Sequence, residues 1–172
     1  MRVIIADHQK RVFNAVQEYH PTFEIELGSP LAFDIDAVVS PANTAGIMNG
    51  GFDAALRRFF GITLEYRVRM RIKDNPISVG EAFAIQTVHP RIKWLIVSPT
   101  VSIAADGLSG VPSVAYTCGY NSVIAAHKAG ASVLGMTGLG TGAGGLSVRD
   151  AVRNQCDGIE DALNDIRHQT YD

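Results

Sequence analysis

Short apolar runs alternate with amphipathic stretches along most of this chain of 172 residues. Residues 3–5 and 37–39 are apolar at consecutive positions, as in strands that are buried on both faces. Between such runs, apolar residues repeat at the helical spacing, as Val12, Val16 and Tyr19 do. Because strands that alternate with helices form parallel sheets covered by helices, the expected fold class is α/β.

The same patterns predict an order of elements. Asp7 can cap the first helix and Ser147 the last, and Gly61 is a helix-ending signal. We expect helices between residues 7 and 21, over 52–60 and 116–128, and from 148 onward. We expect strands over residues 3–5, 23–27, 37–39, 82–88, 94–97 and 132–136.

The composition fits one globular domain over residues 1–172. Hydrophobic residues make up 47% and charged residues 19%, which is enough apolar material for a core. We find no linker, internal repeat or low-complexity tract. The formal net charge of −2 creates no global field that would attract nucleic acid or anionic lipid, which disfavours nucleic acid as a partner.

Cysteine use and hydropathy indicate a cytoplasmic protein. Cys118 and Cys156 lie far apart with no CxxC motif and no accompanying histidine cluster, so we expect two free thiols and no metal site. The N-terminal apolar run is too short for a signal peptide. No stretch approaches the ~20 apolar residues that span a bilayer, so no membrane association is expected.

A first loop, residues 40–51, leaves a buried strand and enters a helix. Gly50 and Gly51 let the backbone approach a ligand closely. Asn43 offers a donor and an acceptor that suit ribose hydroxyls, and Asp53 stands at the start of the helix. Structural roles remain open for both: Asn43 can bond its own turn, and Asp53 can interact with the helix dipole.

A second loop, residues 138–145, has five glycines in eight positions between a buried strand and a helix start. Backbone N–H groups on such a loop can hold a diphosphate without any lysine, and Gly142 is expected to need both glycine's small size and its backbone freedom. The spacing of Gly138, Gly140 and Ala143 also matches the dinucleotide-binding fingerprint. That fingerprint requires a following strand, and none is predicted after residue 145.

Together these loops resemble the two signature loops of the macrodomain family. Residues 36–43 (DAVVSPAN) fall on the family's DAIVNAAN motif, and residues 50–53 (GGFD) fall on its glycine run ending in aspartate. Residues 28–30 (GSP) fall at its Gly-Asp-Ile turn, and residues 80–82 (GEA) and 141–142 (TG) fall on further motifs. The amino acids at these motifs are similar to those of macrodomains encoded by bacteria and phages.

This resemblance implies a three-layer α/β/α fold with a mixed, mostly parallel sheet flanked by helices. Residues 1–27 would add a strand, a helix and a strand to the same sheet. The resemblance also implies a helix over residues 62–73, although the apolar residues there alternate strictly, as in a strand. The arginines of this stretch are expected to form a solvated face, with contact to nucleic acid as the alternative.

The family binds ADP-ribose, and some members hydrolyse it from macromolecules or process its phosphorylated form. The resemblance therefore implies an ADP-ribose site, with Asn43 on the distal ribose and Asp53 orienting or activating water. It implies no cofactor. The other residues expected to bind ligand are Ser29, Pro30, Ala42, Gly50, Gly51, Gly138, Gly140, Thr141, Gly142, Ala143 and Gly144.

Four departures from the family's pattern affect the expected site, and one of them is Ser40, which replaces the first asparagine of the family's NAAN. Ser29 replaces the aspartate that binds the adenine amino group, and Pro30 has no N–H to offer the base. Gly144 replaces an aromatic residue that packs on the distal ribose. Three functions stay open: a hydrolase of ADP-ribosylated molecules, favoured by Asp53; a non-catalytic ADP-ribose-binding module, favoured by Ser29 and Gly144; and a nucleic-acid-associated domain.

Overall fold

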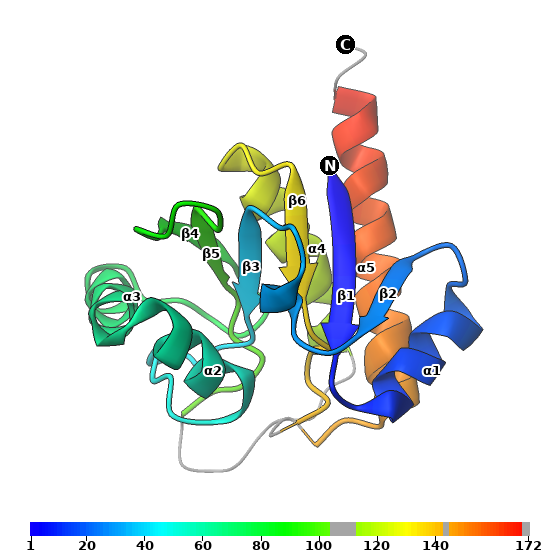
Figure 1. Cartoon of the computed structure of the whole chain (residues 1–172), viewed down its shortest axis with the longest axis horizontal. Helices are drawn as coiled ribbons and strands as arrows, with labels where there is room; N and C mark the ends of the chain where they lie inside the picture. The colour runs from blue at the N-terminus through cyan, green and yellow to red at the C-terminus, as the bar shows by residue number, and fades with distance from the viewer. Residues whose placement is uncertain (104–112, 143–144, 170–172) are drawn as a thin grey trace.

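The computed structural model describes residues 1–103, 113–142 and 145–169. A six-stranded sheet forms the middle layer, in the order β2-β1-β6-β3-β5-β4 (Figure 1). All neighbouring strands run parallel except β4, which is antiparallel to β5. The strands are β1 (Arg2–Asp7), β2 (Glu24–Leu27), β3 (Ala37–Ser40), β4 (Phe83–Gln86), β5 (Trp94–Val97) and β6 (Val133–Met136).

Helices cover both faces of the sheet, which gives the predicted α/β/α architecture. One face carries α1, α4 and α5, and the other carries α2 and α3 (Figure 1). The helices are α1 (Lys10–Tyr19), α2 (Gly51–Phe60), α3 (Ile62–Asp74), α4 (Ser113–Lys128) and α5 (Val148–Gln169), with a 3-10 turn at Pro30–Ala32.

Each face of the sheet has its own hydrophobic core. Val3, Ile5 and Val39 point into the core beneath α1, α4 and α5, whereas Ile4 and Val38 point into the core beneath α2 and α3. Successive side chains of a strand lie on opposite faces, so a strand between two helical layers must be apolar at every position. This is why the central strands are recognisable as continuous apolar runs.

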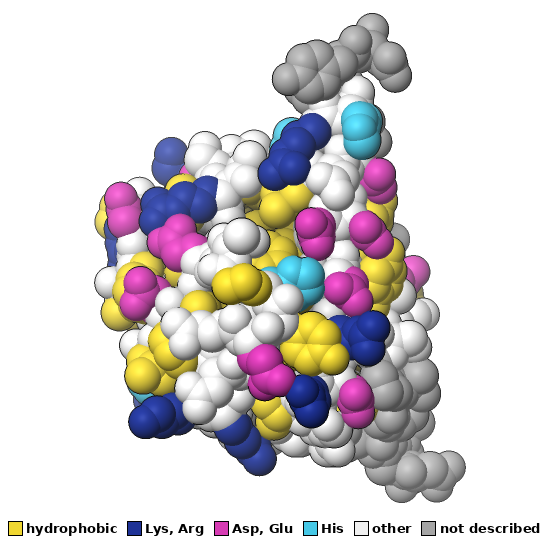
Figure 2. Space-filling view, turned by 90° about the vertical axis from the view of Figure 1, so that its right-hand side faces the viewer, with side chains coloured by type: hydrophobic (Ala, Val, Ile, Leu, Met, Phe, Trp, Pro, Cys, Tyr) yellow, Lys and Arg dark blue, Asp and Glu magenta, His cyan; other side chains and the backbone are white. Residues whose placement is uncertain are grey.

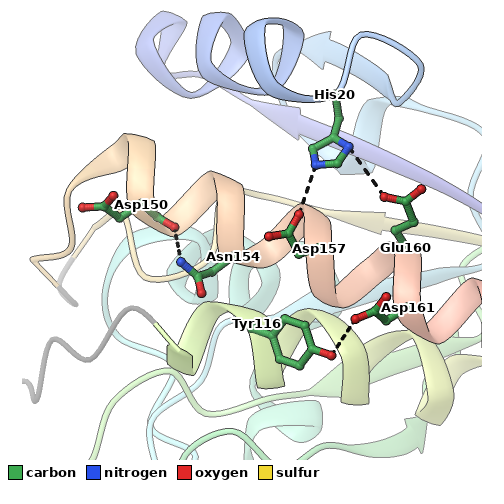
Figure 3. Close-up of polar contacts among 7 residues, drawn as sticks. All are labelled: His20, Tyr116, Asp150, Asn154, Asp157, Glu160 and Asp161. Carbon is green, nitrogen blue, oxygen red and sulfur yellow. Dashed lines mark hydrogen bonds and ion pairs between the residues drawn. The ribbon is translucent and has the colours of Figure 1, made fainter.

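Residues 1–27 supply two strands of this sheet. β1 lies between β2 and β6 and pairs with both in parallel. Polar contacts hold α5 against α4 and against the residue that follows α1 (Figure 3): His20 Nε2 lies 3.3 Å from Asp157 Oδ1, and the Tyr116 hydroxyl donates to Asp161 at 2.8 Å. α5 therefore ties the N-terminal unit to the rest of the layer.

The segment over residues 62–73 is a helix, as the resemblance implied. Leu64, Val68 and Ile72 are buried at the i, i+4, i+8 spacing. Ile62 and Tyr66 lie on the exposed face of the same helix. The strict alternation in the sequence arises because two faces of one helix are apolar, a pattern that strand periodicity alone cannot distinguish.

Some predicted details were wrong. Asp7 ends β1 and does not cap α1: its carboxylate accepts the N–H of Gln9, at 2.8 Å, and Gln9 is the residue before the first helical turn. β4 is shorter than residues 82–88, and α4 begins at Ser113 instead of Tyr116. None of the helices in the described part of the chain combines the length and apolarity needed to cross a membrane.

Candidate functional site

A cleft of about 590 Å³ opens beyond the carboxyl ends of β1, β3 and β6, at the lower end of the sheet in Figure 1. Its walls come from the turn at residues 7–9, the loop and helix start at 41–53, and the glycine loop at 137–142. Parallel strands place the loops that follow them at one edge of the sheet, where ligands of open α/β sheets bind.

The structure brings the described residues of the predicted site together in this one cleft. The lining includes Ser29, Pro30, Ala42, Asn43, Gly50, Gly51, Asp53, Gly138, Gly140, Thr141 and Gly142. Ala143 and Gly144, which the sequence also assigned to the site, lie outside the described residues.

Asp53 is a buried carboxylate at the wall of the cleft. It lies in the first turn of α2 with 6% of its surface exposed, and the Ser40 hydroxyl donates to its Oδ1 at 2.6 Å. Burial raises the pKa of Asp53 to about 6; the Ser40 hydrogen bond opposes this effect and the charge of Glu65 adds to it. A carboxyl group with a pKa near neutrality can both donate and accept a proton at physiological pH.

Glu65 is a buried acidic residue of α3 that the sequence analysis missed. Its Oε2 lies 2.8 Å from Arg57 Nε, and its Oε1 accepts the N–H of Met48 at 3.0 Å. It therefore fastens the loop before α2 to α3. The sequence does carry a signal, because Glu65 is the one acid in a basic stretch that ends at Lys73.

The side chain of Asn43 holds the shape of its own loop. Its Oδ1 accepts the N–H groups of Ala45 and Ile47, at 3.2 and 3.1 Å, and its Nδ2 donates to the carbonyl of Ile47 at 2.8 Å. An amide NH2 group has two hydrogens, so one N–H remains beyond the bond to Ile47. Asn43 thus bonds its own turn, as one of the two expectations had it, and it also lines the cleft, so the expected role on the ribose stays a prediction.

The glycine loop is held by side chains from two other elements. Asp7 Oδ2 accepts the N–H of Gly138 at 3.0 Å, and Gln155 Oε1 accepts the N–H of Leu139 at 2.8 Å. Thr141 closes the loop by donating its hydroxyl to the carbonyl of Gly138 at 3.1 Å. The first two N–H groups of the loop are therefore occupied, as is that of Gly145, which donates to the carbonyl of Gly142 at 3.1 Å. Among the described residues of the loop, the N–H groups of Gly140, Thr141 and Gly142 are the candidates for a ligand.

Glycine is required at Gly140 for reasons that do not apply at Gly142. Gly140 has a φ of +74°, and a Cβ there would meet the side chain of Leu146 at 2.7 Å. Gly142 has no left-handed φ, and a Cβ there would meet nothing within 4 Å. The expectation that Gly142 needs glycine's backbone freedom is therefore wrong, and only a bound ligand would make its small size matter.

Other lining residues were not predicted. His8 and Gln9 follow β1, and Asn49 and Phe52 flank the two glycines at the start of α2. Arg58 is the one Arg or Lys among the described lining residues. Position after a buried parallel strand was the available signal for His8 and Gln9, whereas nothing in the sequence singled out Arg58.

The cysteines and His89 lie away from this cleft. Cys118 and Cys156 are buried free thiols on α4 and α5, and burial raises both pKa values, that of Cys156 to about 12. His89 Nδ1 accepts the N–H groups of Arg91 and Ile92, at 3.3 and 3.1 Å, so this ring shapes a turn. Within the described residues, no three His, Cys, Asp or Glu side chains gather as metal ligands would.

Comparison with known proteins identifies the family of this chain. The model of the Macro domain matches residues 39–154. An uncharacterized protein of Aeropyrum pernix is 32% identical over 130 residues, which cover 75% of this chain and 66% of the relative. An uncharacterized protein of Aquifex aeolicus is 30% identical over 126 residues, which cover 73% of each chain.

Solved structures with the same fold are macrodomains. The macrodomain of Mycobacterium tuberculosis DarG superposes with a TM-score of 0.68 at 19% identity, covering 78% of this chain and 87% of that one. A Trypanosoma brucei macrodomain in complex with ADP-ribose superposes with a TM-score of 0.65 at 21% identity, covering 80% of this chain and 56% of that one. The Macro domain match extends over more than half of the 172 residues, so the chain belongs to the macrodomain family.

Proposed function

We propose that this protein binds ADP-ribose, or a closely related nucleotide diphosphate, in the cleft beyond β1, β3 and β6. The observation that carries the proposal is the convergence of the loops at residues 29–30, 41–53 and 137–142 on one cleft. The membership of the chain in the macrodomain family supports it. The ADP-ribose complex of the Trypanosoma brucei macrodomain adds support from a protein of the same fold.

The diphosphate is assigned to the space between the glycine loop and the N-terminus of α2. No described side chain caps α2, which begins at Gly51, so its first N–H groups are available to an anion. Asp7 and Asp53 are the carboxylates among the described residues that line the cleft. Each repels a diphosphate less than a free carboxylate would, because Asp7 accepts two N–H groups and the raised pKa of Asp53, about 6, leaves part of this carboxyl uncharged near neutral pH. Arg58 adds a positive charge at the cleft.

The distal ribose is assigned to the end of the cleft that holds Asn43 and Asp53. The remaining N–H of Asn43 can donate to a ribose hydroxyl, and Asn49 offers a second amide nearby. The adenine is assigned to the end formed by Ser29, Pro30 and the residues that follow β1.

Calorimetry tests the binding proposal. ADP-ribose should bind more tightly than AMP, because the loops are expected to contact the diphosphate and the distal ribose. AMP has only one phosphate and no distal ribose. We expect a difference of at least about tenfold, since the lost groups make several hydrogen bonds to backbone N–H groups. Equal affinities for the two ligands would reject the assignment.

We further propose that Asp53 gives the protein hydrolase activity, either on ADP-ribosylated macromolecules or on a phosphorylated form of ADP-ribose. The supporting observation is a buried carboxyl with a pKa of about 6 at the ribose end of the cleft. Such a group can take a proton from an attacking water and hold that water near the anomeric carbon. The Ser40 hydroxyl, which donates to Oδ1, fixes the carboxyl and leaves Oδ2 for water.

An Asp53→Ala variant tests this second proposal. Release of ADP-ribose from an automodified protein substrate should fall by about 10²-fold or more, as it does when a positioned acid–base group is lost. ADP-ribose affinity should change much less. Absence of turnover in the unsubstituted protein, together with tight binding, would favour the non-catalytic ADP-ribose-binding module.

The cellular setting is also a proposal. We place the protein in the cytoplasm, which two free and buried thiols support. Its partners would be free ADP-ribose or macromolecules that carry it. A nucleic-acid-associated role has less support, because Arg57 and Arg71 of the basic stretch make contacts inside the protein, with Glu65 and with the Phe83 ring.

A further inference from the structure

The outer face of α3 carries an apolar stripe that the fold leaves exposed. Ile62, Tyr66 and Met70 are 64%, 64% and 36% exposed. They are four residues apart, so they line one side of the helix over about 12 Å. α3 is the outermost helix on its side of the molecule in Figure 1.

The stripe is not needed to hold α3 on the domain. The opposite side of the helix already packs into the core through Leu64, Val68 and Ile72, each at most 7% exposed. Isolated exposed apolar residues are ordinary, but a row at regular helical spacing is a feature of binding surfaces.

Positive charge borders this stripe. Arg69 and Lys73 are exposed, and among the described residues neither forms an ion pair. On the side of the molecule away from α3, by contrast, acidic and basic side chains are interspersed (Figure 2). Asp74, the last residue of α3, is exposed too, but Arg69 and Lys73 outnumber it. The local charge of the α3 face therefore favours a partner with acidic groups beside its apolar ones.

We propose that the outer face of α3 docks an amphipathic helix of a partner protein. The partner's apolar side chains would lie on Ile62, Tyr66 and Met70, and its acidic side chains would face Arg69 and Lys73. Ridges formed by residues four apart on one helix pack into the grooves of another. Tyrosine, methionine and arginine are also the residues that protein interfaces favour.

The composition of the stripe favours a protein over a nucleic acid. Bases stack on aromatic rings, and Tyr66 is the one ring of the three stripe residues. Ile62 and Met70 offer a base no comparable platform, whereas both fit against the aliphatic side chains of a helix. Two of the neighbouring arginines, Arg57 and Arg71, already make contacts within the protein, which leaves them less available to a phosphate backbone.

This surface is separate from the proposed ADP-ribose cleft. Ile62, Tyr66, Met70, Arg69 and Lys73 are absent from the described lining of that cleft. Docking on α3 therefore does not depend on ADP-ribose binding, and substitutions on the stripe should leave the cleft unchanged.

The test uses the whole protein and a synthetic helix. The probe is a peptide of about 18 residues, long enough to hold a helix, with leucines along one face and glutamates beside them. Titration into ¹⁵N-labelled protein should shift the amide resonances of α3 and leave those of residues 137–142 unmoved. We expect a Kd of about 10–100 µM.

Matched variants locate the contact. Tyr66→Ala with Met70→Ala should weaken binding at least about tenfold, and Arg69→Glu with Lys73→Glu should do the same. Leu27→Ala, an equally exposed apolar residue on β2, and Lys93→Glu, an exposed cation at the start of β5, should leave the Kd unchanged. All variants should keep the calorimetric ADP-ribose response of the parent protein.

Three outcomes would overturn the proposal. The first is no resonance shift on α3 at millimolar peptide. The second is equal binding of a peptide with lysines in place of the glutamates. The third is that a single-stranded oligothymidine of about 15 nucleotides binds through Tyr66 while the acidic peptide does not, which would make the face a nucleic-acid surface.

Discussion

Asp53 is the residue where burial and charge conflict most directly. Its carboxyl is 6% exposed, and the Ser40 hydroxyl is the one side-chain donor described for it. Burial disfavours the charged form, which moves the pKa from the ordinary value of 3.8 to about 6. Relative to the unfolded chain, folding therefore favours the protonated form of Asp53. The contribution of Asp53 to stability is therefore complete below pH ~4 and is lost as the pH rises through about 6.

An Asp53→Asn variant should reveal the free-energy cost of burying the ionised Asp53 carboxylate. The asparagine keeps an oxygen that can accept from Ser40 but cannot ionise. Relative to the parent, the variant should gain about 2–3 kcal/mol of unfolding free energy between pH 4 and pH 8, which is most of the free energy equivalent to the pKa shift. Urea unfolding at the two pH values measures it. A difference between the two proteins that does not vary with pH would show that Asp53 ionises freely.

At the scale of elements, Glu65 joins α3 to the loop that precedes α2. Its carboxylate accepts from Met48 and pairs with Arg57, so three segments meet at one buried group. Glu65 is only 7% exposed, so water cannot take the place of Met48 or Arg57 unless the Glu65 carboxylate becomes exposed. The shape of the cleft wall at residues 44–50 thus depends on a residue outside the cleft.

Replacing Glu65 separates its two contributions. Glu65→Ala should lower the unfolding free energy by about 2–3 kcal/mol, because the Met48 N–H is left buried without its acceptor. Glu65→Gln keeps an acceptor and should cost less. In Glu65→Gln the pKa of Asp53 should also fall, because the nearby negative charge is gone. Carboxyl NMR titration measures that pKa, and an unchanged value would remove Glu65 from the electrostatics of the site.

The glycine loop allows a contrast between two positions in one element. Gly140→Ala should destabilise the fold by about 1–2 kcal/mol, because φ is +74° and the new Cβ would press on Leu146. Gly142→Val should leave the stability unchanged and abolish ADP-ribose binding, because its side chain would fill the ligand's space. Thermal unfolding and calorimetry on both variants decide this. Normal binding by Gly142→Val would place the diphosphate elsewhere.

At the scale of the whole molecule, the sequence predicts an element well where the residue pattern of that element has a single physical cause. The runs that became β3 and β5 were recognisable because both faces of the sheet are covered. The cleft loops were recognisable because glycine clusters follow buried strands. The α3 segment has two causes for its pattern, a core face and an exposed face, and periodicity alone could not separate them.

Contacts between distant segments were not predictable from the sequence. Asp7 lies 131 residues from Gly138, and the clamp between them depends on β1 and β6 being neighbours. The hydrogen bond from Ser40 to Asp53 and the ion pair of Glu65 depend in the same way on how α2 and α3 fold back on the sheet. Local patterns carry no information about such packing.

The end of the cleft to which the adenine is assigned is formed by two turns of the N-terminal part of the chain. The turn after β1 and the 3-10 turn that begins at Pro30 meet there because β1 and β2 are adjacent strands. Ser29 Oγ accepts the N–H of Leu31 at 3.3 Å, and its hydroxyl hydrogen remains. A hydroxyl is a weaker acceptor for an amino group than a carboxylate, and Pro30 has no N–H for the ring nitrogen.

Weak selection of adenine follows from this construction. A charge-assisted hydrogen bond contributes roughly 1.5–3 kcal/mol against about 1 kcal/mol for a neutral one, so adenine selectivity should be about 10- to 100-fold lower than a carboxylate and an N–H would give. The measurement compares ADP-ribose with its hypoxanthine analogue, which lacks the amino group. The parent protein should bind the two within about tenfold, and Ser29→Asp should tighten ADP-ribose alone, provided that this loop reaches the base. Strong rejection of the analogue by the parent would mean that another group at this end of the cleft, such as His8 or Gln9, recognises the adenine.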